Sequence, residues 1–142
     1  DLRSDGYDLR EALVFYDGLG QLGRGFYMRS TIFDTIWPLM VALTGFAFAR
    51  QTFSRWWLIV PFAAGPIAFG ILDLLENIGL MTMNWSFPEI AGTMVSSSNA
   101  LTLAKLSTLY VAFAAFFALP IVSAGIGLAR NFGANRSRIQ TK

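Results

Sequence analysis

The sequence predicts an all-α integral membrane protein with three transmembrane helices and one short amphipathic surface helix. Two observations carry this prediction. Of the 142 residues, 54% are hydrophobic and 14% are charged, whereas a soluble domain carries about 25% charged residues. Three stretches are also apolar on all sides and long enough to cross a bilayer, which takes about 20 residues. The length is that of a single domain.

The segment before the first membrane crossing covers residues 1–30. Within it, residues 8–17 repeat apolar side chains at helical spacing, and Gly18 and Gly20 follow them. We therefore expect a short amphipathic helix over 8–17 that ends at these glycines. The sequence starts with Asp1 rather than Met, so we expect an upstream membrane span or a cleaved signal segment. With an upstream span, the protein forms a four-helix bundle.

Three crossings are expected from the apolar stretches, and the prolines inside them are tolerated in membrane helices. Residues 81–99 are expected to form a longer, nearly uncharged loop, whose SSSN end offers N-caps for the third crossing. The predicted segments are transmembrane helices at 31–49, 56–80 and 101–129, a turn at 51–55, the loop at 81–99 and a basic tail at 130–142.

The basic residues predict how the chain is oriented. Arg50 and Arg55 flank the short turn, four more basic residues follow the last crossing, and no acid accompanies these six. The 81–99 loop has no Lys or Arg. The positive-inside rule then places the turn and the C-terminus in the cytoplasm, and the loop and the N-terminal segment outside. The expected interfacial anchors are Trp56 and Trp57 at the inner surface and Trp85 at the outer surface.

A few polar side chains interrupt the apolar stretches, and this topology collects them near the outer surface. Asp73, Glu76 and Asn77 lie near the end of the second crossing, on roughly one helix face, and Lys105 lies near the start of the third. Each charge then sits at the helix pole that disfavours it, and an unpaired charge inside a bilayer costs about 2.5–3.5 kcal/mol. We therefore expect Lys105 to pack against Asp73 or Glu76. Asp34 lies at the same depth, where a helix N-terminus alone explains a carboxylate.

Two interpretations of this cluster stay open. It is either a structural clamp that holds three helices in register, or a site for a ligand, an ion or a proton, including a general acid/base pair. Three carboxylates face one ammonium group, so either one acid is protonated or another cation completes the set. The sequence has no Cys and no His, so we expect no metal site and no cofactor bound through these residues. Contact with lipid or pigment remains open.

The layout of three segments, IFDTIWPLMVALTGF, ILDLLEN and LAKLSTLYVAFAAFFALP, resembles the second, third and fourth helices of EXPERA-type membrane proteins. That group of four-helix proteins includes sterol isomerases and lipid-binding receptors. The layout is also similar to that of small bacterial four-helix membrane proteins of unknown function. The resemblance implies a bundle with acids inside the membrane. The isomerases bring histidine to their pocket and this chain has none, so no catalytic residue is carried over.

The leading functional hypothesis is a non-catalytic integral membrane subunit that packs against and stabilises a larger complex, of photosynthetic or respiratory type. Its expected partners are the lipid bilayer and other membrane subunits. The basic tail can touch anionic lipid, and no nucleic acid is expected. The alternative is a small membrane bundle that binds or isomerises a hydrophobic ligand through an outer-leaflet carboxylate cluster.

Overall fold

The computed structural model describes the backbone of residues 6–140 and the side chains of residues 6–128. The described part of the chain is helical and has no strand. Three helical stretches are long and apolar enough to cross a membrane, which confirms the predicted all-α class and the expected make-up of a multi-pass membrane protein. The helices are α1 (Leu9–Asp34), α2 (Ile36–Thr52), α3 (Trp56–Ser86) and α4 (Gly92–Gln140).

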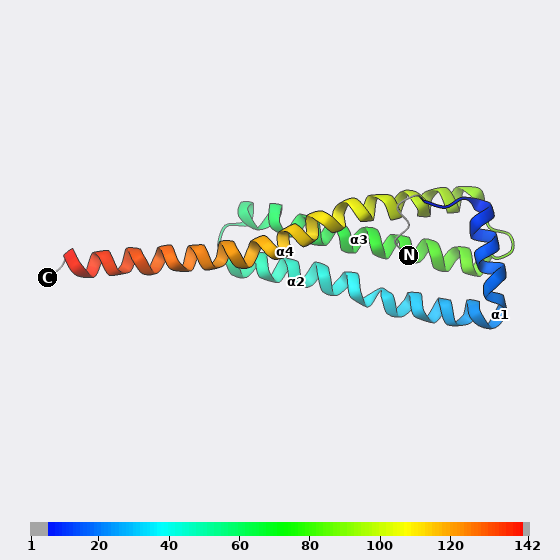
Figure 1. Ribbon diagram of the computed structural model, residues 1–142, viewed down its shortest axis with the longest axis horizontal. Helices are drawn as coiled ribbons and strands as arrows, with labels where there is room; N and C mark the ends of the chain where they lie inside the picture. Colours follow the sequence, from blue (N-terminus) through cyan, green and yellow to red (C-terminus); the bar gives the residue numbers. More distant parts are fainter. Residues whose placement is uncertain (1–5, 141–142) are drawn as a thin grey trace.

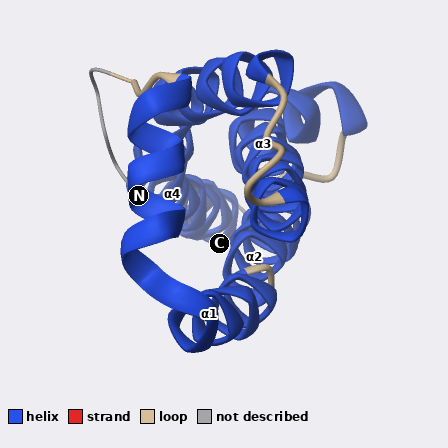
Figure 2. Ribbon diagram, turned by 90° about the vertical axis from the view of Figure 1, so that its right-hand side faces the viewer, coloured by secondary structure: helices blue, strands red, loops and turns tan. Residues whose placement is uncertain are grey.

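Helix α3 lies at the centre of the bundle, and α2 and α4 pack along it. Contacts between α2 and α4 are far fewer than those that each makes with α3. The first part of α1 turns across one end of the bundle, at the right of Figure 1 and facing the viewer in Figure 2. Helix α4 continues beyond the opposite end as a single helix (Figure 1). The buried apolar residues form two clusters, one where α1 meets α3 and the start of α4, and one where α2, α3 and α4 meet near the turn at residues 53–55.

The surface helix begins as predicted, but it does not end where the sequence suggested. Asp8 caps α1 through a capping box, since its carboxylate accepts from the Glu11 backbone and the Glu11 carboxylate accepts from the Asp8 backbone. Gly18 is helical, and the backbone leaves helical geometry only at Gly20 (φ 61°, ψ −179°), a conformation open essentially to glycine alone. Helix then resumes and runs to Asp34. A glycine inside a helix costs only about 1 kcal/mol, and the packing of both halves of α1 outweighs that amount.

The predicted 81–99 loop is wrong, because most of it is helix. Helix α3 continues to Ser86 and α4 begins at Gly92, which leaves only residues 87–91 as a connection. Packing against α1 holds the additional turn of α3. The helix ends there because Pro88 disfavours helical geometry at the residue before it. The SSSN residues do not cap α4 but lie inside it, where Ser96 donates to the Gly92 carbonyl one turn back. Such back-bonding satisfies a hydroxyl without breaking a helix.

The other boundaries agree with the prediction in part. Helix α3 starts at Trp56 as expected. The predicted first crossing, 31–49, falls within a longer helical stretch, Leu9–Thr52, that is a candidate for crossing a membrane. One residue, Thr35, separates α1 from α2 within it, and its φ of −62° and ψ of −19° are still helical. Helix α4 extends through the predicted tail as far as Gln140, and the basic side chains of 130–142 lie outside the described side chains.

Close approach at glycines fixes the antiparallel register of α2 and α3. A Cβ atom on Gly70 would lie 2.8 Å from the Pro38 carbonyl oxygen, and one on Gly45 would lie 2.5 Å from the Pro66 side chain. Only a residue without a side chain allows this spacing. The same register, extended along α2 to the end of α1, places Asp34 at about the level of residues 73–77 of α3.

Candidate functional site

The predicted ammonium and two of the predicted acids meet inside the bundle. Lys105 of α4 lies between Asp73 and Glu76 of α3: its Nζ atom is 2.8 Å from Asp73 Oδ1, and it forms a second ion pair with Glu76. The three side chains are only 9%, 8% and 2% exposed, in the order Lys105, Asp73, Glu76. A buried charge is tolerated only when it is paired and hydrogen-bonded. These contacts therefore join α3 to α4 at a site with almost no access to solvent.

Hydroxyl groups extend this ion pair along α4 towards the connection at residues 87–91. Thr102 donates to Glu76 Oε1, and its hydroxyl also lies 3.1 Å from the Ser98 carbonyl oxygen. One turn further on, the Tyr7 hydroxyl donates to Ser98 Oγ at 2.8 Å. We call this set of residues, Tyr7, Asp73, Glu76, Ser98, Thr102 and Lys105, the polar ladder.

Sequence reasoning missed Tyr7, Ser98 and Thr102. Ser98, Thr102 and Lys105 are spaced four and three residues apart, which places them on one face of a helix. That spacing could have predicted a shared helix face. It was overlooked because the expected loop at 81–99 placed Ser98 outside the helix. Tyr7 carried no comparable signal, because its contact spans 91 positions in the sequence.

The ladder lies deeper along the helices than predicted. Glu76 is about three turns before the end of α3 at Ser86, and Lys105 lies further than that from the start of α4 at Gly92. The helix dipole acts only within the first or last turn, so the predicted misfit of each charge with its helix pole is wrong. Pairing is favoured instead because both sites are buried away from water.

The remaining members of the predicted cluster are not part of the ladder. Asp34 is exposed, and among the described residues Lys105 pairs only with Asp73 and Glu76. Asn77 is 3% exposed and its Nδ2 has no hydrogen-bond partner. The paired set thus holds two carboxylates and one ammonium group. Within the described residues, no group of three or more His, Cys, Asp or Glu side chains is placed to hold a metal ion.

The three predicted tryptophan anchors are exposed at opposite ends of α3. Trp56 and Trp57 begin the helix and are 74% and 52% exposed, while Trp85 lies next to its last residue and is 85% exposed. Trp56 and Trp85 are separated by about 44 Å along the axis at 1.5 Å per residue. A bilayer including its headgroup regions is about 40–45 Å thick. The spacing suits the predicted interfacial role.

Helix α1 closes the end of the bundle that carries Trp85. The Tyr16 hydroxyl donates to the Leu80 carbonyl at 3.0 Å, and Asn84 Nδ2 donates to the Arg24 carbonyl at 3.0 Å. Arg24 itself donates to the Tyr16 carbonyl at 3.2 Å and lies 4.5 Å from the centre of the Phe87 ring. These bonds hold both halves of α1, on either side of the bend, against α3.

Tyr7, which precedes α1, lies partly buried beneath this closed end. Burial raises the pKa of its phenol above the usual value of 10.0; the hydrogen bond to Ser98 opposes this shift and the Glu76 carboxylate adds to it. Tyr7 is therefore a neutral phenol at physiological pH, able to donate its proton to Ser98.

An apolar groove lies on the bundle between α2 and α4, with α3 at its base. It holds about 630 Å³, counting the part open to the surface, and its lining is almost entirely apolar. None of the residues of the polar ladder lines it. The groove is formed by Trp37, Val41, Phe69, Leu109, Ala112, Phe113, Phe116 and Phe117.

No protein-family model matches this chain, and neither a curated protein nor a solved structure matches it. The resemblance to EXPERA-type proteins therefore stays a prediction about architecture.

Proposed function

We propose that this chain is a non-catalytic integral membrane subunit that packs against and stabilises a larger membrane complex. The observation that carries the proposal is the contrast between its two kinds of surface. The charged side chains of α3, and of α4 as far as residue 128, pair with one another, with Lys105 engaged by both Asp73 and Glu76. Its outward faces are broad and apolar.

The internal pairing supports a clamp rather than a reactive site. A general acid or base must reach the proton that it moves, whereas Asp73 and Glu76 lie against Lys105 and Glu76 also accepts from Thr102. A clamp of this kind keeps α3 and α4 in one register. The chain then presents a fixed surface to its neighbours in the membrane.

The apolar groove supports a partner in the membrane. Trp37, Phe113 and Phe117 on its walls are 59%, 50% and 73% exposed. Large exposed aromatic side chains are enriched at interfaces between proteins. The groove between α2 and α4 is therefore where we place a helix of the larger complex.

The test combines native extraction with site-specific photo-cross-linking. A photoreactive amino acid is placed at Phe117 in the groove and, as a matched control, at Ile71, an exposed residue of α3 that does not line the groove. We expect one membrane protein to cross-link from position 117 but not from 71, to co-purify in fixed stoichiometry, and to lose abundance when the gene for this chain is deleted. A chain that remains a lone monomer in membranes of its own host contradicts the proposal.

A second function, binding of a hydrophobic ligand, is favoured by the lining of the groove. Small-molecule pockets are lined mainly by apolar and aromatic side chains, as this groove is. The carboxylates do not line it, so such a ligand would be held by apolar contact alone. Organic extraction of the purified protein, followed by mass spectrometry, tests this. One lipophilic compound at a fixed ratio, lost in a Phe69→Ala variant, supports ligand binding, and only bulk lipid argues against it.

A further inference from the structure

The polar ladder contains one positive and two negative side chains. Among the described residues, Lys105 is the one cation that pairs with Asp73 or Glu76, and it lies against both. If all three groups are ionised, the ladder carries one net negative charge inside the bundle. A charge without a counter-charge is so costly in a protein interior that the group changes its protonation state instead. The ladder therefore needs either a second cation or one proton.

The described part of the chain supplies no second cation. Its other basic side chains are all arginines. Arg24 is engaged with the Tyr16 carbonyl and the Phe87 ring. The remaining ones are exposed and pair with neither acid of the ladder: Arg10, Arg29, Arg50 and Arg55. None of these side chains neutralises the ladder.

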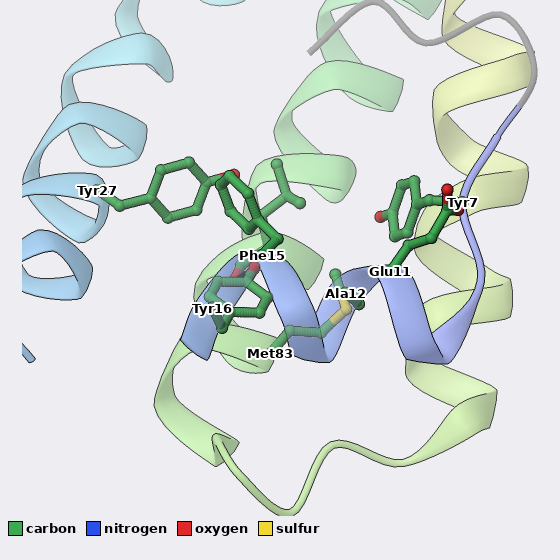
Figure 3. Close-up of a pocket in the computed structure, with 8 residues that line it drawn as sticks. Tyr7, Glu11, Ala12, Phe15, Tyr16, Tyr27 and Met83 are labelled. Carbon is green, nitrogen blue, oxygen red and sulfur yellow. Dashed lines mark hydrogen bonds between the residues drawn. The ribbon is translucent and has the colours of Figure 1, made fainter. Parts of the chain in front are cut away.

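Two phenols face Glu76 from the side of α1. Tyr7 and Tyr27 line the pocket beneath the first half of α1, on its two sides (Figure 3). The Glu76 carboxylate lies close enough to each phenol to act on it electrostatically. A phenol carries no positive charge in either of its forms, so neither ring replaces the missing cation. A proton is the remaining way to make the ladder neutral.

The contacts of the Thr102 hydroxyl indicate where this proton lies. Thr102 Oγ1 is within hydrogen-bonding distance of both Glu76 Oε1 and the Ser98 carbonyl oxygen. A hydroxyl has one hydrogen, and neither an ionised carboxylate nor a carbonyl oxygen can donate one. With an ionised Glu76, one of the two contacts therefore lacks a hydrogen. With a proton on Glu76, the acid donates to Thr102, and Thr102 donates to the carbonyl one turn back, a common bond for Thr in a helix. Both contacts are then hydrogen bonds.

We propose that Glu76 is a proton-binding site, which is occupied at neutral pH, and that Asp73 and Lys105 form the ion pair of the ladder. This arrangement makes the ladder neutral. Glu76 is also the less exposed of the two acids, at 2% against 8%, and burial disfavours the charged form of an acid. The proton is held as part of the structure and is not transferred in a reaction. The site lies inside the chain, so it does not depend on the partner of the proposed packing function.

Infrared spectroscopy of the purified full chain, in a detergent without ester groups, detects this proton. A protonated carboxyl group has a C=O stretch above the amide I band, and an ionised carboxylate lacks it. Exposed glutamates are ionised at neutral pH, and Glu76 is the one buried glutamate among the described residues. We expect wild type to show the band at neutral pH, and the band to shift with ¹³C-labelled glutamate but not with labelled aspartate. No band, or a band that shifts with aspartate, overturns the proposal.

Variants then assign the band to a residue. Glu76→Gln should abolish it and keep the fold, because a Gln amide is neutral and donates to Thr102 as the protonated acid does. Asp73→Asn should also abolish it, because Lys105 then has only Glu76 as a counter-charge and Glu76 releases its proton. Glu89→Gln, at an exposed position in the connection between α3 and α4, is the matched control and should keep the band. A band that survives Glu76→Gln or Asp73→Asn overturns the assignment.

Unfolding at different pH values measures the same proton independently. The folded chain holds one proton on Glu76, and the unfolded chain, whose glutamates are ionised at neutral pH, releases it. Stability should therefore fall as pH rises around neutrality, with the equilibrium constant of unfolding increasing about tenfold per pH unit. Titration with denaturing detergent measures this slope. Glu76→Gln should lose it and Glu89→Gln should keep it. Equal slopes in wild type and Glu76→Gln contradict the proposal.

Discussion

Lys105 is the residue on which the interior of the bundle depends most. It neutralises one of two buried carboxylates and lies against both. Removing one partner of a buried ion pair is far more damaging than replacing the whole set with apolar groups, because the orphaned charge stays buried. Measuring how much the ladder contributes to stability therefore requires both single variants and variants in which several members are changed together.

Lys105→Met is expected to destabilise the protein by about 3 kcal/mol, since it leaves Asp73 and Glu76 buried without a cation. The triple variant with Asp73→Asn and Glu76→Gln should recover at least half of that loss. The free energy of unfolding in detergent, measured by titration with denaturing detergent, gives both values. Leu103→Met, at an exposed position on the same helix, is the control. A single variant as stable as wild type would rule out the ladder as a clamp.

Tyr7 gives the bundle a dependence on alkaline pH. Because burial raises its pKa above 10.0 in the folded protein, its neutral form favours folding relative to the unfolded chain. That contribution is fully present below about pH 10 and is lost as pH rises through the folded pKa. We expect the phenolate absorbance that appears above about pH 10 to fall by one tyrosine's share in Tyr7→Phe. Absorbance unchanged by this substitution would show that other tyrosines cause it.

At the scale of single residues, the sequence could predict which charges meet but not what completes their contacts. Lys105 and the acids could be paired from the energy of a bare charge in a bilayer. Thr102 was missed because a hydroxyl in an apolar helix is usually satisfied by its own backbone, and Tyr7 because its contact spans 91 positions in the sequence. Their role depends on which face of α4 meets α3, and hydropathy alone does not fix that rotation. Hydropathy also does not fix the rotation of α1, so it could not predict that Asp34 is exposed.

At the scale of helices, the backbone conformation of one residue in α1 sets the direction of the segment before it. Gly20 provides a backbone conformation that turns the first half of α1 across the bundle end. The bend is needed for Tyr16 to reach Leu80. Glycines elsewhere in α1 have no such role, and this difference can be tested directly.

Gly20→Ala is expected to destabilise the protein by about 1–3 kcal/mol, because alanine is strained at this φ and ψ. Gly18→Ala is the matched control. Gly18 is helical, and a Cβ atom there meets nothing within 4 Å, so alanine should stabilise by about 0.5–1 kcal/mol. Thermal unfolding followed by circular dichroism compares the two. Equal effects at both positions would contradict a bend specific to Gly20.

Hydropathy predicted which segments are helices, but it did not predict where those helices end. Long apolar runs leave few options in a bilayer, because every backbone group must be bonded internally. The ends of α3 and α4 depend instead on contacts with α1, which hold Met83 and Asn84 in place. Those contacts cannot be predicted from the sequence of a polar stretch such as residues 81–99. Only Pro88 marked the actual end of α3.

At the scale of the whole molecule, the predicted orientation is open to a simple test because the chain has no cysteine. Ser54→Cys lies in the turn between α2 and α3, and Glu89→Cys lies in the connection between α3 and α4; both positions are exposed. With an odd number of crossings between them, a membrane-impermeant thiol reagent should label position 89 from outside intact cells and position 54 only after the membrane is opened. Labelling of both from the same side contradicts the three-span topology.

The two ends of the bundle are held by different forces, and this makes the molecule mechanically asymmetric. In the half of the bundle towards α1, ionic and hydrogen-bonded contacts join α3 to α4, beside an apolar cluster of Ala12, Tyr16, Met83, Ile90 and Val95. Near the turn at residues 53–55, the described contacts of the core are apolar, formed by Ala49, Phe53, Ile59, Ala63 and Leu119. Lipid tails can replace such contacts at little loss, but they cannot solvate an exposed ammonium or carboxylate. Under lateral tension the helices would thus spread at the turn and pivot about a stiff opposite end.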